Sequence, residues 1–145
     1  MPLVIADDDP EDCLLARDAL EEARLGNPVV IVSDGEELMD YLCNRGAHKR
    51  AEPVAKPALI LLDLKMPRKD GFEVLREIKS EPTLRQIPVV VLTTSRAALD
   101  VAATYDLGVN SFISKPVTFE GLVEAMKTLK KYWFGIVELP VNDQQ

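Results

Sequence analysis

Leu59-Ile60-Leu61-Leu62 is the most uniformly apolar run of the chain, and Asp63 follows it directly. A short run of this kind predicts a strand that is buried on both faces, as the strands of a covered parallel sheet are. Met66-Pro67 and Asp70-Gly71 come next and are typical of a loop. The sequence thus places a carboxylate where a buried strand gives way to a loop.

Further apolar runs lie on both sides of this strand and alternate with helical patterns. We expect strands over residues 3–6, 29–32, 59–62, 89–92 and 111–114. We expect helices from Asp9-Pro10 to about Leu25, after Asp34-Gly35, after Asp70-Gly71, over 97–107, and along an apolar stripe from Phe119 to Trp133. This alternation predicts an α/β fold, a doubly wound five-stranded parallel sheet with helices on both faces.

The composition excludes several classes of protein. The 145 residues suffice for one domain, and 17 basic against 24 acidic side chains give a net charge of −7, which disfavours binding to nucleic-acid phosphates. No apolar run reaches the roughly 18 residues of a membrane span, and Met1-Pro2-Leu3-Val4 lacks the basic region of a secretion signal. We therefore expect a cytoplasmic protein, with Cys13 and Cys43 as reduced, buried thiols.

The polar side chains that we single out follow the first, third, fourth and fifth predicted strands. They are Asp7-Asp8-Asp9 after the first, Asp63 after the third, Thr93-Thr94-Ser95 after the fourth and Lys115-Pro116 after the fifth. Open parallel sheets bind ligands beyond the carboxyl ends of their strands. We therefore expect carboxylates, hydroxyls and one ammonium to converge on one edge of the sheet.

Such a set has a definite chemistry. Clustered carboxylates repel one another and favour a cation between them, and a site with oxygen ligands alone favours a hard cation such as Mg²⁺. A carboxylate can attack a phosphoryl group and form an aspartyl phosphate. A metal ion and a lysine would neutralise the charge of the transferring oxygens.

The same residues resemble the receiver domains of response regulators, over about residues 3–131. The matching segments are Ala6-Asp7-Asp8-Asp9-Pro10-Glu11-Asp12, Leu61-Leu62-Asp63-Leu64-Lys65-Met66-Pro67 with Asp70-Gly71, Val91-Leu92-Thr93-Thr94-Ser95, and Phe112-Ile113-Ser114-Lys115-Pro116. The resemblance implies the flavodoxin-like strand order 2-1-3-4-5. It also implies a two-component regulator that accepts a phosphoryl group from a histidine kinase and then signals through protein contacts.

The resemblance further assigns a role to each site residue. Asp63 is similar to the phosphoacceptor, and Lys115 to the lysine that pairs with the phosphoryl group. Asp7, Asp8, Asp63 and the backbone carbonyl of Lys65 match the Mg²⁺ ligands, which leaves Asp9 as a helix cap. Thr93 and Phe112 match a switch pair of hydroxyl and aromatic ring, and the Lys115–Pro116 bond is usually cis in the family.

Two residues depart from the common pattern. Lys65 stands where many receivers have Asn, and Thr94 is bulkier than the usual Ala or Gly. Both leave the lifetime of the phosphorylated state open, and neither bears on the acceptor role.

A narrower resemblance is to single-domain regulators paired with bacterial phytochrome histidine kinases. It rests on the long loop 44–57, on Leu92-Thr93-Thr94-Ser95 and on the apolar segment after the last helix. We divide the chain into a receiver domain, residues 1–131, and an apolar extension with a loose tail, residues 132–145. We expect a homodimer through the last helix and this extension, and a solvated His48.

Three other functions compete with the phosphorylated switch. A phosphatase that uses an aspartyl nucleophile usually carries an acidic residue two positions later, where this chain has Lys65, so we do not expect an enzyme with turnover. A constitutive interaction module would keep the site without signalling. A flavin-binding protein of this architecture needs a phosphate loop after the first strand, where three aspartates stand here.

Overall fold

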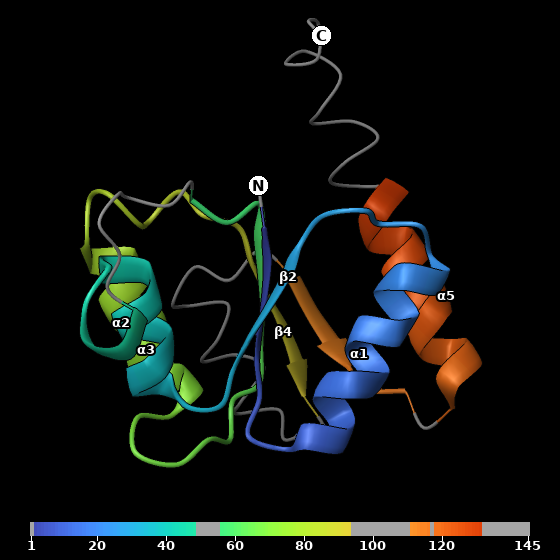
Figure 1. Cartoon of the computed structure of the whole chain (residues 1–145), viewed down its shortest axis with the longest axis horizontal. Helices are drawn as coiled ribbons and strands as arrows, with labels where there is room; N and C mark the ends of the chain where they lie inside the picture. The colour runs from blue at the N-terminus through green and yellow to red at the C-terminus, as the bar shows by residue number, and fades with distance from the viewer. Residues whose placement is uncertain (1, 49–55, 94–110, 117, 132–145) are drawn as a thin grey trace, which may run out of the picture. The chain divides into compact units, whose positions relative to one another are not determined.

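The computed structural model describes residues 2–48, 56–93, 111–116 and 118–131. They form a five-stranded parallel sheet in the order β2-β1-β3-β4-β5 (Figure 1). The strands are β1 (Leu3–Ala6), β2 (Val29–Val32), β3 (Leu59–Leu62), β4 (Val89–Thr93) and β5 (Ser111–Ser114). The predicted fold class and strand order are confirmed, and β4 extends one residue further than expected, to Thr93.

The chain divides into two compact units, each described here by itself. The described residues of the first unit are 2–13, 27–48, 56–93 and 111–115, and those of the second are 14–26, 116 and 118–131. The first unit holds the whole sheet, so the predicted site edge lies within one unit. The helix expected over residues 97–107 lies outside the described residues.

The core of the first unit lies between the sheet and two helices, α2 (Gly35–Cys43) and α3 (Gly71–Ser80). Every residue of β1 and β3 is buried, as the apolar runs predict. Val4, Ile60 and Val91 contribute to the same cluster as Leu38 of α2 and Leu75 of α3. Figure 1 shows α2 and α3 together on one side of the sheet. This burial of aliphatic side chains, about 2 kcal/mol each, is the main source of the stability that holds the strand ends in place.

Local signals fix where the two helices begin. Asp34 caps α2 by accepting from the Glu37 N–H, and Asp70 forms a capping box with Glu73 at the start of α3. A Cβ on Gly71 would lie 2.7 Å from Leu64 Cα and 2.8 Å from the Asp63 carbonyl oxygen. Only glycine lets α3 begin this close to the backbone that follows β3.

Two predictions in this unit were wrong in detail. Cys43, at the end of α2, is exposed, whereas Cys13 is buried as expected. His48, in the short helix η1 (Gly46–His48), is partly buried rather than freely solvated: its Nε2 lies 2.9 Å from Glu37 Oε2, and its ring packs edge-on against Tyr41. The Gly46 turn, with φ of 63°, brings the imidazole back onto α2.

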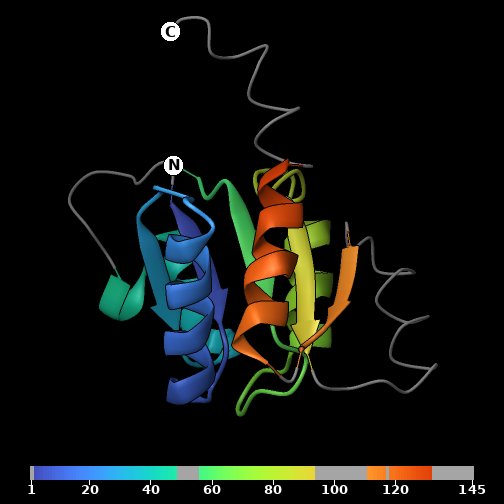
Figure 2. The same ribbon diagram turned by 90° about the vertical axis from the view of Figure 1, so that its right-hand side faces the viewer.

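The second unit contains most of α1 (Pro10–Glu22) and all of α5 (Phe119–Leu129), which lie side by side (Figure 2). The helix α1 begins at Pro10 as predicted but ends at Glu22, because Arg24 adopts a left-handed conformation with φ of 65°. The stripe of α5 buries Leu122, Val123, Met126 and Leu129, whereas Phe119 is exposed. Of the helices that the structure describes, none has the length and apolar character needed to cross a bilayer.

Candidate metal and phosphoryl site

Three carboxylates meet where β1 and β3 end. Ala6 pairs with Leu62 in the sheet, so Asp7 and Asp63 follow neighbouring strand ends. One oxygen from each of Asp7, Asp8 and Asp63 lies within 4.8 Å of the others. Asp7 and Asp63 are buried and Asp8 is exposed, so the group opens to solvent on the side of Asp8. The structure thus brings together the three side chains that the sequence singled out.

Asp9 caps a helix instead of joining these three carboxylates. Its Oδ1 accepts from the Glu11 N–H at 2.9 Å and from the Asp12 N–H at 3.4 Å, so it caps the first turn of α1. Its own N–H donates to Asp7 Oδ1 at 3.0 Å. Asp9 therefore holds the Asp7 carboxylate in place through its backbone.

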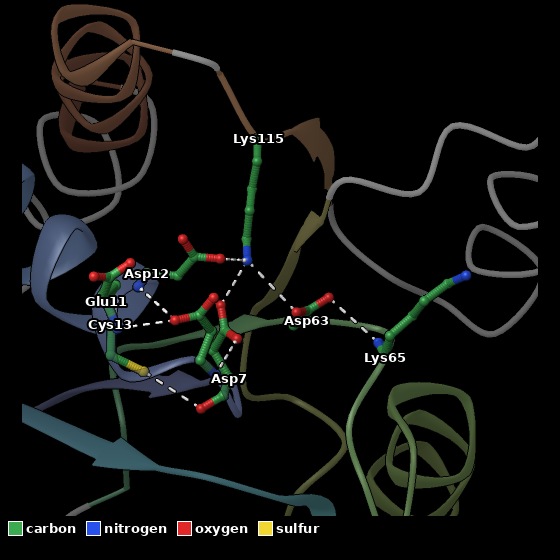
Figure 3. A network of polar contacts seen from close by, with 8 residues as sticks. Asp7, Glu11, Asp12, Cys13, Asp63, Lys65 and Lys115 are labelled. Atoms are coloured by element: carbon green, nitrogen blue, oxygen red, sulfur yellow. Dashed lines mark hydrogen bonds and ion pairs between the residues drawn. The ribbon is translucent and has the colours of Figure 1, made fainter.

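Lys115 reaches the same carboxylates from the end of β5. Its Nζ donates to Asp7 Oδ2 at 2.6 Å, to Asp12 Oδ2 at 2.9 Å and to Asp63 Oδ2 at 3.5 Å (Figure 3). Burial alone would lower the pKa of Lys115, but its bonds with Asp7 and Asp12 outweigh this and raise the pKa. The side chain is therefore a permanent cation at the edge of the sheet. We call Asp7, Asp8, Asp12 and Asp63, together with Lys115, the acidic cluster.

The acidic cluster carries more negative than positive charge. Burial raises the pKa of Asp7 above its usual range, even though Lys115 and the Asp9 N–H act to lower it, and the charge of Asp63 raises it further. Four carboxylates and one ammonium leave an excess that a divalent cation would neutralise. All the candidate donors are oxygens, so the residues fit a hard metal ion such as Mg²⁺.

The backbone of Lys65, rather than its side chain, lies beside Asp63. Its N–H is 3.3 Å from Asp63 Oδ1, and its exposed ammonium group points away from the cluster (Figure 3). The role of the Lys65 carbonyl as a metal ligand stays a prediction.

For the predicted switch pair, Thr93 and Phe112, the structure describes only the position of the backbone. Thr93 ends β4 and pairs with Ser114, and Phe112 in β5 pairs with Val91. The side chains of Thr93 and Phe112 lie outside the described part of the structure. Their predicted motions therefore stay predictions.

The resemblance suggested a cis bond before Pro116. Every peptide bond in the described part of the chain is trans, Lys115–Pro116 included. The Lys115 side chain reaches Asp7 with the bond in this form.

Sequence reasoning missed two neighbours of the site. The sequence patterns assigned Asp12 no role at the site, and they predicted only a buried thiol for Cys13. In the structure Asp12 pairs with Lys115, and the Cys13 thiol donates to the Asp7 carbonyl at 3.4 Å. Burial raises the pKa of Cys13 to about 11, so it remains a thiol at neutral pH.

Comparison with known proteins settles the family. The family model described as the response regulator receiver domain matches residues 3–127. The chain belongs to this family. It is therefore a signalling domain of the two-component type, a class whose members signal by phosphorylation and bind a divalent metal ion.

Individual relatives extend over almost the whole receiver domain. The response regulator Rcp1 of Synechocystis sp. is 37% identical over 138 residues, which cover 95% of this chain and 92% of Rcp1. The crystal structure of the phosphorylated cyanobacterial phytochrome response regulator RcpA has a TM-score of 0.83 at 42% identity, over 92% of this chain and 93% of that one. The Mn²⁺-bound form of Rcp1 has a TM-score of 0.81 at 36% identity, over 91% and 93% of the two chains.

Proposed function

We propose that this receiver domain accepts a phosphoryl group on Asp63 with Mg²⁺ bound by Asp7, Asp8, Asp63 and the Lys65 carbonyl. The observation that carries the proposal is the position of Asp63, buried between the Asp7–Asp8 pair and the Lys115 ammonium. The Mn²⁺-bound form of Rcp1 and the phosphorylated form of RcpA supply support from relatives.

The residues suggest how the transfer proceeds. An Asp63 carboxylate oxygen attacks the phosphorus of a phosphohistidine, the new O–P bond forms, and the P–N bond breaks with its electron pair going to the histidine nitrogen. Lys115 donates to the phosphoryl oxygens, and the Lys65 N–H keeps the second Asp63 oxygen oriented. The metal, when bound, neutralises charge on those oxygens. Thr93 and Phe112 would then switch to a second arrangement that a partner protein recognises.

The direct test uses a small phosphodonor with Mg²⁺ and intact-mass measurement. The wild type is expected to gain one phosphoryl group, and Asp63→Asn none. Asp9→Asn is a matched control, because it removes a neighbouring carboxylate while asparagine still caps the helix. No gain on the wild type, or an equal gain on Asp63→Asn, contradicts the proposal.

The donor that we propose is a cytoplasmic histidine kinase of the phytochrome type, since RcpA is a phytochrome response regulator. Transfer from a panel of phosphorylated kinases to this domain tests it. Faster transfer from phytochrome kinases than from others is expected, and equal rates across the panel argue against this partner.

We also propose a homodimer that uses α5 and residues 132–145, which lie outside the described residues. Sedimentation of the whole chain and of a chain that ends at residue 131 tests this. A dimer that the truncation converts to a monomer is expected. If the whole chain sediments as a monomer, the proposal is contradicted.

A further inference from the structure

Lys115 is surrounded by more carboxylates than the acceptor chemistry requires. Its side chain is 13% exposed, and its ammonium contacts Asp7, Asp12 and Asp63 at once. Asp7 and Asp63 are the proposed metal ligand and acceptor, and Asp12 belongs to neither role. Among the described residues, the carboxylates close enough to share a cation are Asp7, Asp8 and Asp63, and Asp12 is outside that group.

The short contact between Lys115 and Asp7 conflicts with metal binding. Nζ lies 2.6 Å from Asp7 Oδ2, the shortest contact of the lysine. A divalent cation on Asp7 would repel the ammonium and compete for the same carboxylate. A metal ion on Asp7 would therefore weaken the bond between Lys115 and Asp7, and Lys115 would then need another partner.

Asp12 is held where it can serve as that partner. Its N–H donates to Asp9 Oδ1, and the next residue, Cys13, donates its thiol to the Asp7 carbonyl. These bonds fix the first turn of α1 against the end of β1, so the Asp12 carboxylate stays at a set place beside Asp7. Figure 3 shows Asp12 and Asp7 approaching the Lys115 ammonium from different directions.

We propose that Asp12 is a positioning residue that retains the Lys115 ammonium when a metal ion takes over Asp7. The inference rests on the proposed metal site and acceptor. It assigns to Asp12 the task of keeping the lysine beside Asp63, where a transferred phosphoryl group needs it. Without Asp12, the lysine stays on Asp7 and the metal must displace it without an alternative anion nearby.

The test measures Mn²⁺ affinity, by calorimetry and by the electron paramagnetic resonance of the free ion, with no phosphodonor present. Asp12→Asn is expected to weaken Mn²⁺ binding about tenfold, the loss typical of groups that support metal ligands. Glu11→Gln is the matched control, since it removes one carboxylate from the same helical turn and has no bond to Lys115. Its affinity is expected to stay within about twofold of the wild type.

The same substitution in a Lys115→Met protein separates a positioning role of Asp12 from a direct effect of its charge on the metal. In Lys115→Met the competing ammonium is gone, so Asp12→Asn is expected to change Mn²⁺ affinity less than about twofold. If the tenfold loss persists there, Asp12 acts on the metal directly and the positioning role is overturned. Equal losses in Asp12→Asn and Glu11→Gln overturn it as well, while the metal site stands. If the wild type binds no Mn²⁺, the proposed metal site itself fails and the inference fails with it.

Discussion

The acidic cluster and the polar group around Glu37 accommodate carboxylate charge in opposite ways. In the Glu37 group, defined as Ser33, Glu37, Tyr41 and His48, one carboxylate accepts from the Ser33 N–H at 2.8 Å, from Ser33 Oγ at 3.0 Å and meets His48 Nε2 at 2.9 Å. In the acidic cluster, several carboxylates compete for the ammonium of Lys115.

The pKa values show the same difference. Burial would raise the pKa of Glu37, but the bonds from Ser33 and His48 outweigh it and lower the pKa. The pKa of Asp7 is raised because burial outweighs Lys115. Glu37 therefore stabilises the fold when ionised, whereas ionised Asp7 costs stability that a bound cation would recover. A site that depends on a cation is expected to be folded without it but destabilised by its own negative charge, so that binding the cation raises stability.

The largest effect is expected from Lys115→Met. Removing the cation leaves buried Asp7 and Asp63 without it, and we expect a loss of about 3 kcal/mol in metal-free buffer at pH 7. The pKa of Lys115 is raised above its ordinary value near 10.5, so its contribution is complete at pH 7. Urea unfolding in the presence of a chelator measures the loss.

Measuring stability with added Mg²⁺ provides a second test of this prediction. Adding Mg²⁺ is expected to recover more stability in Lys115→Met than in the wild type, because the metal replaces the missing positive charge. A loss below about 1 kcal/mol, or equal Mg²⁺ effects on both proteins, would mean that the cluster is solvated rather than strained.

Glu37→Gln is expected to destabilise the domain by about 1–2 kcal/mol, since the bonds to an ionised carboxylate are lost. The folded pKa of Glu37 lies below its ordinary value near 4.5, so its contribution is present above pH 4.5 and disappears as the pH falls through the folded pKa. Urea unfolding at several pH values should show the difference from wild type shrinking toward pH 3. Glu36→Gln, in the same turn and exposed, is expected to have no such effect.

Asp7→Asn is expected to act in the opposite direction and to raise the free energy of unfolding of the metal-free domain at pH 7. The folded pKa of Asp7 is raised above 3.8, so wild-type stability falls as the pH rises from 3.8 through the folded pKa, and the substitution removes that fall. Lys115 retains Asp12 and Asp63. Thermal unfolding between pH 3 and pH 7 tests the sign, and a destabilised variant contradicts the contrast with Glu37.

Arg68→Gln should have the smallest effect, less than about 0.5 kcal/mol. Its Nε lies 3.6 Å from Asp34 Oδ2, and the arginine side chain is 67% exposed. Asp34→Ala is the comparison, with a cost of about 1 kcal/mol because the N-cap of α2 is lost. A large effect of Arg68→Gln would show that exposed pairs near this loop also stabilise the fold.

The sequence predicted what depends on short-range pattern. The apolar runs at Leu3–Ala6 and Leu59–Leu62 marked the central strands, and Asp9-Pro10 marked the start of α1. Because parallel strands end at a common edge, the neighbourhood of Asp7, Asp8 and Asp63 followed from their places after those strands.

The contacts that were missed join residues with no pattern between them. Asp12 and Lys115 are 103 positions apart, and their pairing depends on the direction of two side chains rather than on any spacing. The contact between His48 and Glu37 depends on the left-handed turn at Gly46. The mixed polar sequence of this loop does not predict that turn. Such contacts become visible only when the chain is folded.

Gly71 contacts neither the carboxylates nor the ammonium, yet it constrains Asp63, the proposed acceptor. Its N–H donates to the Leu64 carbonyl at 3.0 Å, and a methyl group there would press on the main chain of residues 63 and 64. Even an alanine at position 71 would displace the backbone carbonyl of Asp63. Substitutions outside the carboxylates and the lysine can therefore also disturb the site, because the missing side chain at the start of α3 helps to set the position of Asp63.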